Sequence, residues 1–535
     1  MADLSFDAVV VGGGSKTMIT AMYLAKFGGM KVGVFEDKAE LGGGWCSEES
    51  PAPGFIHNTC ATGIGKFYFI PIYEDFPDFE EKGVYIHPVN LFVPFKEDDS
   101  YMLFYNSETD PTQERGAKTI VPFSQKDADT WLWLWNVWLK MRPKWLQWAF
   151  NPAKPLGEHD VLDNFPEFGL DFHWMFMSMR QAIDMLFESP EMRSWLYKFA
   201  TAWMVPLEYT GTAMAIMFFL LMVEEGFVRG GTHSIAHACQ RILQENGVRT
   251  FRNATVEKII VENGRATGIR LADGRQVAAK QLVVTNVNPH QLLDLAGEKN
   301  FPDMIVRKVK ALSTKMSPEV WYGWATHEAP NYKASKHNPD VNQPSITVLA
   351  ERADPESFVR KQNQSFAGVL VPDPPMWVWC WTTADPRQAP PGKHTCGSES
   401  FALPATALTE RQWMKYKEDH AEHAIKTWQQ YAPNMTWDNV IGYDPMTPYD
   451  HNHLLNARPH GNPNGGVDGL PHQSGRMRPI PELAQHRTPV KGLYATGSGW
   501  HPATLGWACQ GYNCYKVIAE DLRLPKPWEK AGRAF

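Results

Sequence analysis

The chain has 535 residues, which is more than one compact core normally contains, so we expect two or more lobes. Its formal net charge of −7 gives no support for nucleic-acid binding, which usually shows as a basic domain. The seven cysteines form no CxxC pair, which argues against a structural zinc site and against a disulfide scaffold.

The ends of the sequence and its apolar runs bear on location. The first residues, "MADLSFDAVVVGGG", lead directly into a predicted strand, without the basic and apolar segments of a signal peptide. The longest apolar run, Gly211 to Val223, is shorter than the roughly 20 residues that a membrane-spanning helix requires. We therefore expect a cytoplasmic protein that contacts a membrane at most peripherally.

The segment Asp7 to Glu36 is predicted to form a strand, a glycine turn, a helix and a second strand. "DAVVVGG" is an apolar run typical of a buried parallel strand, and "SKTMITAMYLAKFG" has apolar residues at helical spacing. "KVGVFE" is a second strand that ends in an acid. This order is typical of a dinucleotide-binding unit, in which an acid about 20 residues after the glycines bonds the adenosine ribose.

The glycine turn excludes one phosphate-binding motif and departs from another. A Walker A loop needs a glycine directly before Lys16, where this chain has Ser15. In the dinucleotide pattern GxGxxG, Gly12 and Gly14 fit but the third position is Thr17, so we expect a slightly displaced helix. The pyrophosphate would still lie on N–H groups at the helix N-terminus. The residues expected to contact the dinucleotide here are Gly12, Gly14, Ser15, Lys16, Thr17, Glu36 and Asp37.

A second glycine run, "ELGGGWC", follows the ribose acid. It resembles the GG doublet of the flavoprotein superfamily that contains amine oxidases and phytoene desaturases, where the backbone passes close to the dinucleotide phosphates. Glycine suits this approach because it has no side chain and accepts a positive φ. The resemblance implies FAD rather than NAD, with contacts from Gly42, Gly43, Gly44 and Trp45. Family members often have an arginine after the doublet, so here a cationic contact must come from elsewhere.

The middle of the chain is rich in tryptophan and methionine. Thr130 to Phe150 contains six tryptophans and suggests either a helix lying on a membrane or a helix buried against the second lobe. We favour the buried helix, because apolar residues occupy almost the whole circumference of the predicted helix. The resemblance implies an apolar substrate tunnel in this lobe, and methionine and aromatic residues suit an apolar ligand. We therefore expect a large hydrophobic small-molecule substrate.

The segment Gly226 to Pro289 is predicted as a glycine turn, a helix ending at Gly247, a short strand, a hairpin and a buried strand. Asn263-Gly264 and Asp273-Gly274 are strong turn signals between alternating strands. The segment resembles the part of the same family that returns to the FAD domain. That resemblance implies a contact between the backbone of Val256 and the adenine side of FAD.

The segment Tyr449 to Pro479 contains a cluster of histidine and asparagine residues. His451 and His453 alternate as in a strand, so both could face one metal ion. No carboxylate or cysteine completes the set, and the segment is rich in glycine and proline. We predict a polar loop over the cofactor and no metal site.

The segment Thr488 to Leu522 resembles the C-terminal flavin motif of phytoene desaturases and their retinol saturase and carotenoid isomerase relatives. The residues that match "LYxxGxxxHPxxxxxG" are Leu493, Tyr494, Gly497, His501, Pro502 and Gly506. The resemblance implies flavin contacts from Gly497, Ser498, Thr504, Leu505 and Gly506. A helix N-terminus aimed at the flavin pyrimidine would stabilise negative charge on the reduced ring.

Two further segments, Val121 to Trp131 and Ala182 to Leu196, match the same family in order, so the resemblance covers nearly the whole chain. It is weakest from Phe301 to Val440. It implies an α/β fold with a Rossmann-like FAD-binding domain built from discontinuous segments and an inserted α+β substrate domain. We expect FAD-binding parts at 1–100, 226–300 and 441–535, and substrate parts at 101–225 and 301–440.

The resemblance implies an FAD-dependent desaturase, saturase or isomerase of an isoprenoid- or carotenoid-like substrate. Because the flavin performs the redox step, the chain mainly binds and orients. Our candidates for a polar catalytic role are His501, His57, Glu208 and Tyr209, and His501 is equally well explained as a structural residue beside Pro502. An amine oxidase and a non-catalytic prenyl or lipid carrier of the same fold remain alternatives.

Overall fold

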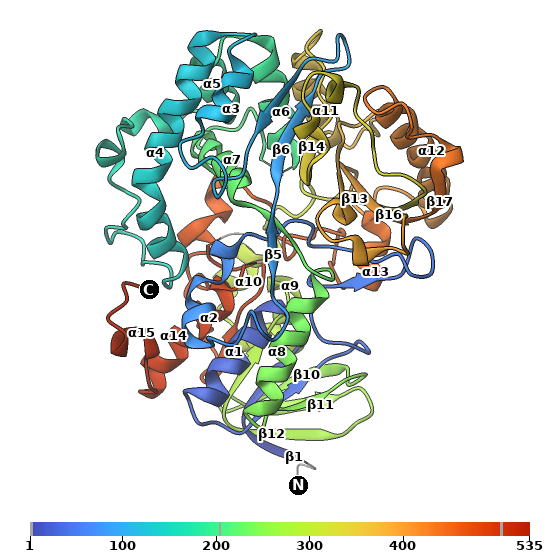
Figure 1. The fold of residues 1–535 in the computed structure, drawn as a ribbon. Coiled ribbons are helices and arrows are strands. Elements are labelled where there is room, and N and C mark those ends of the chain that lie inside the picture. The colour runs from blue at the N-terminus through green and yellow to red at the C-terminus, as the bar shows by residue number, and fades with distance from the viewer. Residues whose placement is uncertain (1–3, 203–204, 503–506) are drawn as a thin grey trace.

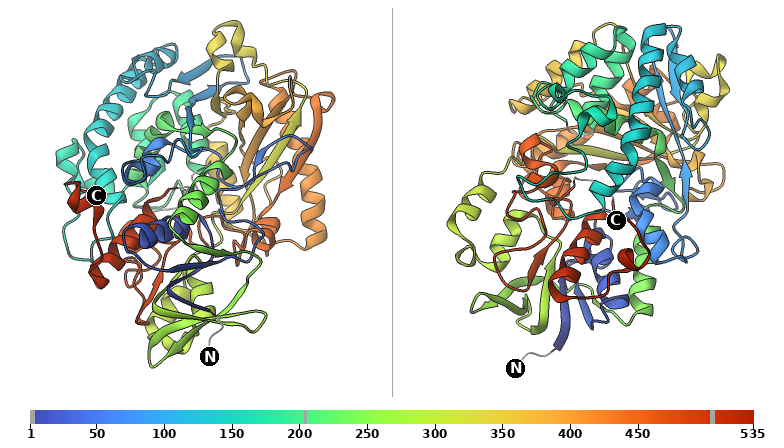
Figure 2. Two further views of the ribbon diagram at one scale, coloured as in Figure 1. Left: turned by 60° about the horizontal axis from the view of Figure 1, so that its bottom comes forward. Right: turned by 90° about the vertical axis from the view of Figure 1, so that its left-hand side faces the viewer.

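The computed structural model describes residues 4–202, 205–502 and 507–535. Its first large sheet lies at the bottom of Figure 1 and its second at the upper right, and a group of helices occupies the upper left. Figure 2 shows the same separation from two further sides. This arrangement confirms the predicted α/β class, a Rossmann-like domain built from discontinuous segments with a second domain inserted into it.

The first sheet is built from segments that are far apart in the sequence. Its strand order is β10–β11–β12–β1–β2–β9, and β18 pairs with β12. The pairs β1–β12, β1–β2, β2–β9 and β12–β18 are parallel, and β10, β11 and β12 form an antiparallel meander. The strands are β1 (Leu4–Val11), β2 (Val32–Phe35), β9 (Arg249–Phe251), β10 (Val256–Glu262), β11 (Arg265–Leu271), β12 (Gln276–Thr285) and β18 (Leu493–Ala495).

Both faces of this sheet are covered, which explains why β1 is a continuous apolar run. Ala8 and Val10 belong to a core shared with α1 (Ser15–Lys26), α8 (His233–Glu245) and α14 (Cys509–Leu522). Val9 and Val11 belong to the opposite core, which includes residues of β10, β11, α9 (Pro289–Ala296) and α10 (Asp303–Lys310). Successive side chains of a strand point to opposite faces, so one segment supplies both cores.

The second sheet has the strand order β17–β13–β16–β15–β14–β6–β7. Its strands are β6 (Asn90–Pro94), β7 (Tyr101–Phe104), β13 (Glu319–Thr326), β14 (Ser345–Val348), β15 (Trp377–Cys380), β16 (His394–Phe401) and β17 (Val440–Met446). One face packs on α12 (Glu410–Gln429) through residues such as Tyr322 and Trp324. The strand β6 pairs in parallel with β14, so the chain enters this sheet before residue 100, the expected end of the first FAD-binding part.

The helical region consists of α3 (Glu114–Ile120), α4 (Gln125–Ala149), α5 (Met179–Leu186), α6 (Pro190–Ala202) and α7 (Ile216–Leu221). The long helix α4 is capped at its N-terminus by Ser124, whose hydroxyl accepts a hydrogen bond from Asp127 N at 3.1 Å. Trp131, Trp135, Trp138 and Trp145 are buried, as in the interpretation of this segment as a helix packed inside the protein. Of the helices in the described ranges, none combines the length and apolar character that a bilayer crossing needs.

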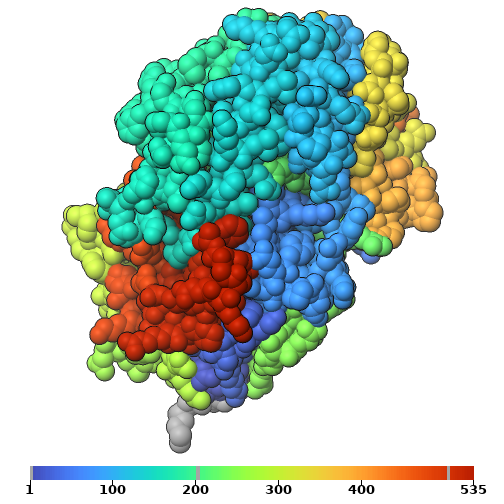
Figure 3. All heavy atoms as spheres, turned by 60° about the vertical axis from the view of Figure 1, so that its left-hand side comes forward, coloured from blue at the N-terminus to red at the C-terminus, as the bar shows by residue number. Residues whose placement is uncertain are grey.

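The C-terminal segment packs against the end of α4. The rings of Phe150 and Phe535 stack with centroids 5.6 Å apart, and Asn151 Nδ2 donates to the carbonyl oxygen of Ala534 at 3.1 Å. Figure 3 shows this red segment directly against the teal helical region. The end of the chain therefore joins the first domain to the helices.

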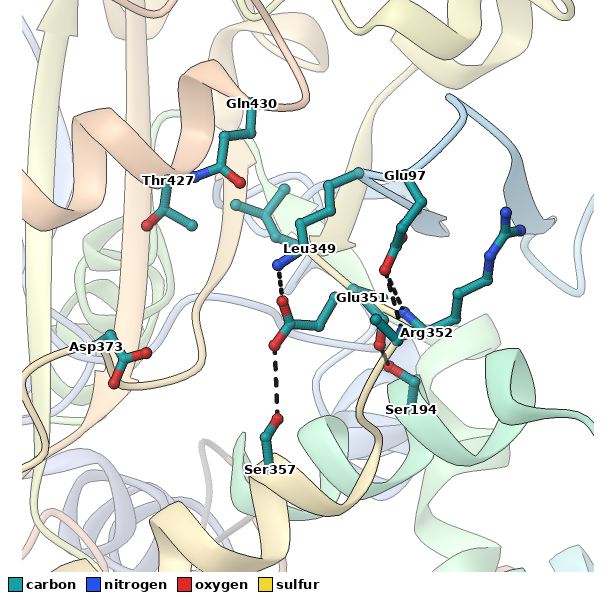
Figure 4. A network of polar contacts seen from close by, with 12 residues as sticks. Glu97, Ser194, Leu349, Glu351, Arg352, Ser357, Asp373, Thr427 and Gln430 are labelled. Carbon is teal, nitrogen blue, oxygen red and sulfur yellow. Dashed lines mark hydrogen bonds and ion pairs between the residues drawn. The ribbon is translucent and has the colours of Figure 1, made fainter.

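A polar network joins the helices to the second sheet (Figure 4). The hydroxyl of Ser194 on α6 donates to the carbonyl oxygen of Glu351, just after β14. The next residue, Arg352, donates its backbone N–H to Glu97 Oε1 at 2.9 Å. These bonds connect α6 and the loop after β6 with the same short segment.

Candidate functional site

A cavity of about 1400 Å³ extends from the first sheet to the second. It begins at the carboxyl ends of β1 and β2, the edge where open parallel sheets bind their ligands. It ends at the face of the second sheet that carries Trp321, Trp377 and Trp379. Its volume exceeds the roughly 300–1,000 Å³ typical of pockets for drug-sized molecules, so a large cofactor and a second molecule fit together.

The two glycine runs meet at the first end of this cavity. Gly42 N donates to the carbonyl oxygen of Gly13 at 2.9 Å, and Gly14 and Gly42 form an isolated β-bridge. A Cβ added to Gly43 would lie 3.1 Å from Gly14 Cα, and Gly43 has a φ of +58°. Side chains at these positions would fill the space in front of α1, so the glycines keep a cradle open at a helix N-terminus.

The acid at the end of β2 is part of this cradle. Glu36 Oε2 accepts a hydrogen bond from Gly13 N at 2.6 Å, and Oε1 accepts one from Lys38 N at 2.9 Å. Burial, followed by the contact with Asp37, raises the pKa of Glu36 to about 7. Asp37 Oδ2 in turn accepts a hydrogen bond from Asn456 Nδ2 at 2.8 Å, which ties the C-terminal loop to the cavity rim.

Thr17 does not narrow the cavity. Its hydroxyl donates to the carbonyl oxygen of Gly12 at 2.6 Å, and its buried side chain is not part of the cavity wall. The close helix packing in this region depends instead on Gly511 of α14, where an added Cβ would lie 2.0 Å from the carbonyl oxygen of Lys16. The phosphate side of the cavity therefore stays open despite the missing third glycine.

Lys16, Lys38 and Arg458 are the lysine and arginine residues of the cavity lining. Lys16 is buried at the start of α1, and burial lowers its pKa to about 8. Arg458 comes from the C-terminal loop, which the sequence did not single out for a cationic role. Lys16 and Arg458 are candidates for the cationic contact that an arginine after the GG doublet often supplies in the flavoprotein superfamily.

Most of the residues expected to bind the cofactor form part of the cavity wall. They are Gly12, Gly14, Ser15, Lys16, Glu36, Asp37, Gly43, Gly44, Trp45, Val256, Gly497 and Ser498. Gly42 and Thr17 lie directly behind this wall. Thr504, Leu505 and Gly506 are outside the described residues, so their predicted contacts with the flavin stay predictions.

The far end of the cavity is largely apolar and contains a buried acid. Its apolar lining includes Met222, Ile346, Trp321, Trp377, Trp379 and Met446. Glu225 lies among them, and the hydroxyl of Tyr68 donates to its Oε1. Burial raises the pKa of Glu225 to about 8, so this carboxyl group is protonated at neutral pH.

Two further carboxyl groups, Glu319 on β13 and Glu399 on β16, face the cavity from the second sheet. Glu399 lies opposite Trp321 in one strand pair and opposite Trp377 in the other. Glu319 is two residues before Trp321 and therefore shares its face. Trp377 Nε1 donates to Glu399 Oε2 at 2.8 Å. Burial, followed by the neighbouring acid, raises the pKa of Glu319 well above its usual range, and burial also raises that of Glu399.

Comparison with known proteins finds relatives of this chain. No protein-family model matches the chain. The chain is 26% identical to a limonene dehydrogenase component of Castellaniella defragrans, over 98% of this chain and 96% of the relative. It is 26% identical to a lycopene-forming phytoene desaturase of a Paracoccus species, over 52% of this chain and 51% of the relative. The chain is therefore similar to proteins named as a dehydrogenase and as a desaturase.

A solved structure supports the fold of this chain. A crystal structure of an oxidoreductase from Methanosarcina mazei superimposes with a TM-score of 0.60 at 17% identity. The alignment covers 97% of this chain and 100% of that one. At this identity the likeness bears on the fold alone, and it extends over both sheets and the helices between them.

The structure places the two predicted catalytic histidines, His501 and His57, outside the cavity lining. His501 is buried, its Nε2 lies 3.2 Å from the carbonyl oxygen of Trp148, and it is not part of the cavity wall. These contacts favour a structural role for His501 over a catalytic one. His57 is also buried, and its Nδ1 lies 3.5 Å from Oδ2 of Asp444, which does line the cavity. His57 is therefore placed to orient Asp444 and does not reach the cavity itself.

The structure places Glu208 and Tyr209, the other two candidates for a catalytic role, away from the cavity. Both residues are exposed and neither lines the cavity. Glu208 Oε1 forms an ion pair with Arg180 Nη1 at 2.6 Å, and its Oε2 accepts a hydrogen bond from Asn363. The polar residues of this segment interrupt the apolar sequence because the chain reaches the surface there.

The histidine cluster near the C-terminus also differs from its prediction. His451 and His453 lie on a helix, α13 (Pro448–Leu454), and not on a strand. His451 is buried against Trp321 and lines the cavity, whereas His453 is exposed. A different group, Glu40, His233 and His237, brings its ligand atoms within 4.8 Å of one another, and sequence reasoning did not identify it.

The most important residues that sequence reasoning missed are the buried acids Glu225, Glu319 and Glu399. In β13 the signal was present in the alternation "EVWYGW", where a glutamate shares one strand face with a tryptophan. No local pattern joins Glu319 to Glu399, because strand pairing alone brings them together.

Proposed function

We propose that the chain is an FAD-dependent oxidoreductase that acts on a large apolar substrate of isoprenoid or carotenoid type. The observation that supports this most strongly is the continuity of one cavity from the glycine cradle to the tryptophan-lined face of the second sheet. A dinucleotide along the first wall would extend toward Gly497 and Ser498, which leaves the apolar end for a substrate. Bound FAD would supply a hydride acceptor or donor between these two ends.

The residues present fit FAD in chemistry as well as in space. Glu36 and Asp37 would accept hydrogen bonds from the ribose, beside the backbone of Val256 at the adenine end. The cradle at the start of α1 would receive the pyrophosphate, with Lys16 as a buried cation. These groups bind and orient, and the buried walls exclude water from the reacting end.

The apolar end indicates the substrate class. Trp377 and Trp379 present flat apolar surfaces, and Met222 and Met446 adapt to irregular shapes. Relatives of this chain include proteins named for limonene and for phytoene, one a small cyclic and one a long acyclic hydrocarbon. We therefore propose a hydrocarbon or weakly polar terpenoid.

One observation favours a second candidate, an amine oxidase. The acids Glu319 and Glu399 lie where a substrate's ammonium group would find a counter-charge. The tryptophans around them and the relatives named for terpenoids make an apolar substrate the better proposal.

Purified protein tests both candidates. The proposal predicts a flavin absorption spectrum, FAD as the mass of the cofactor released by heat, and bleaching of the spectrum under anaerobic conditions by phytoene, limonene or another terpenoid. Putrescine and a longer alkylamine serve as the competing substrates. A colourless protein, or bleaching by the amines with no response to any terpenoid, would contradict the proposal.

A further inference from the structure

We propose that Glu319 and Glu399 hold one proton between them at the apolar end of the cavity and exchange it with the substrate. In the dehydrogenating direction Glu399 is the base. This inference rests on the proposed function, because it requires an oxidoreductase whose substrate reaches the second sheet.

Because the carboxyl groups of Glu319 and Glu399 are both buried, we expect them to share one proton. Glu319 is 1% exposed and Glu399 is 8% exposed, and both face the same cavity. Neither oxygen of Glu319 has a hydrogen-bond donor among the described residues. Two neighbouring carboxylates in a poorly solvated site cannot both ionise at reasonable cost. A proton on Glu319 that is donated to Glu399 provides the missing donor and removes one charge.

The surroundings decide which acid keeps the charge. Trp377 Nε1 donates to Glu399 Oε2 at 2.8 Å, and a donor to a carboxylate stabilises its charged form. Glu319 has no such donor among the described residues, so the proton belongs on its side of the pair. Because the two groups interact strongly, their titration belongs to the pair and not to either residue.

The other titratable groups at the apolar end of the cavity do not neutralise the single negative charge of the Glu319–Glu399 pair. Burial raises the pKa of the Cys60 thiol above its usual range, so that neighbour is protonated. Burial lowers the pKa of His451 to about 3, so its ring is neutral. Glu225 is protonated up to about pH 8. Lys16 interacts with Cys60 on the cofactor side, and Asp444 has its partner in His57. Of the described groups that interact with the pair, none is a cation.

The proposed reaction needs a proton acceptor at the apolar end of the cavity. Dehydrogenation removes a hydride and a proton from adjacent carbons, and the electron pair of the second C–H bond forms the new double bond. FAD bound as proposed would supply the hydride acceptor. A carboxylate oxygen of Glu399 takes the proton, so the pair passes from one proton to two and returns one to water after the product leaves. In the saturating direction the same proton moves to the substrate.

Infrared difference spectroscopy of the holoprotein in D₂O at neutral pH tests the shared proton without turnover. The spectrum of wild type minus Glu319→Gln should contain the C=O band of a protonated carboxyl group. A control change, Glu191→Gln, removes an acid that, like Glu399, is 8% exposed but lies outside the cavity and contacts Arg352, and it should leave that band in place. If the wild-type minus Glu319→Gln spectrum shows only ionised carboxylate, the shared proton is refuted.

Stopped-flow reduction of the bound flavin by the terpenoid that bleaches the wild type tests the proton transfer. Glu399→Gln should slow this reduction by about 100-fold or more, because a positioned acid or base contributes about 10²–10⁴ in rate. Reduction by dithionite, and the rate with Glu191→Gln, should be unchanged. A Glu399→Gln rate within threefold of wild type would overturn the assignment.

A second variant keeps the test valid if Glu399→Gln does not fold. Trp377→Phe keeps an aromatic ring but removes the donor to Glu399, so it should shift the pH profile of substrate-driven reduction to higher pH. An unshifted profile contradicts the role of the pair. A wild-type protein without flavin would sink the proposed function, whereas the infrared result reports on the pair in either case.

Discussion

Replacement of Glu36 is the most informative single change at the cofactor end, because this acid connects the fold to the ligand. Its Oε2 accepts a hydrogen bond from the buried Gly13 N at 2.6 Å, and it lines the cavity where the ribose would lie. Glu36→Ala removes both interactions. Glu36→Gln keeps an oxygen that can accept from Gly13 but removes the charge.

The magnitudes separate the two variants. A buried N–H without its acceptor costs about 1–3 kcal/mol, so Glu36→Ala should lower the free energy of unfolding by this amount. Lys38 is exposed, so water can replace the second bond. Loss of hydrogen bonds to a charged group costs about 1.5–3 kcal/mol, and each 1.4 kcal/mol is tenfold in affinity. FAD should therefore bind Glu36→Ala about 10-fold to 100-fold more weakly.

Two assays check these values. Denaturant unfolding of the apoprotein measures stability, and quenching of flavin fluorescence during reconstitution measures affinity. Because the pKa of Glu36 is raised to about 7, wild-type affinity for FAD should rise as pH increases through 7, where the carboxylate forms. Glu36→Gln should lose this dependence. Wild-type affinity in Glu36→Ala would refute the placement of the ribose.

Three other changes have clear expected outcomes. Gly511→Ala places a Cβ 2.0 Å from the carbonyl oxygen of Lys16, so it should destabilise the protein by about 1–3 kcal/mol and weaken flavin retention, as measured by unfolding and gel filtration. Burial raises the pKa of Glu225 from 4.5 to about 8. Between these pH values the carboxyl group ionises in the unfolded chain but resists ionisation in the folded protein, so its contribution to stability is lost progressively as pH rises from about 4.5 towards 8. Glu225→Gln should therefore flatten the fall of melting temperature with pH, and an unchanged slope would contradict its burial. Glu208→Gln should leave turnover and flavin content at wild-type values, because the exposed ion pair with Arg180 contributes little.

Sequence patterns predicted the first domain well because its signals are local. The apolar run of β1, the helical spacing of α1 and the turn at Asn263-Gly264, where both residues have positive φ, each depend on neighbouring residues. The glycine runs were identifiable for the same reason, and the structure brings them together at one cavity wall.

Local sequence patterns could not predict the strand pairing of the second sheet or the position of its buried acids. β6 pairs with β14 across about half the chain, and Glu319 meets Glu399 only through strand register. The exposed position of Glu208 could not be predicted, because a polar interruption in an apolar sequence looks the same at a surface and at a catalytic site. The helix at His451 did have a local signal, since Thr447 and Asp450 form a capping box and Pro448 occupies its first turn.

The central claim is that one cavity holds a flavin dinucleotide along the glycine cradle and an apolar substrate against the second sheet. A crystal structure of the coloured, purified protein tests it most directly. We predict density for FAD with its ribose at Glu36 and its ring system near Gly497, and open space between the ring and Trp377. A cradle without a dinucleotide in such crystals, or a ring system that points away from the second sheet, would contradict the account.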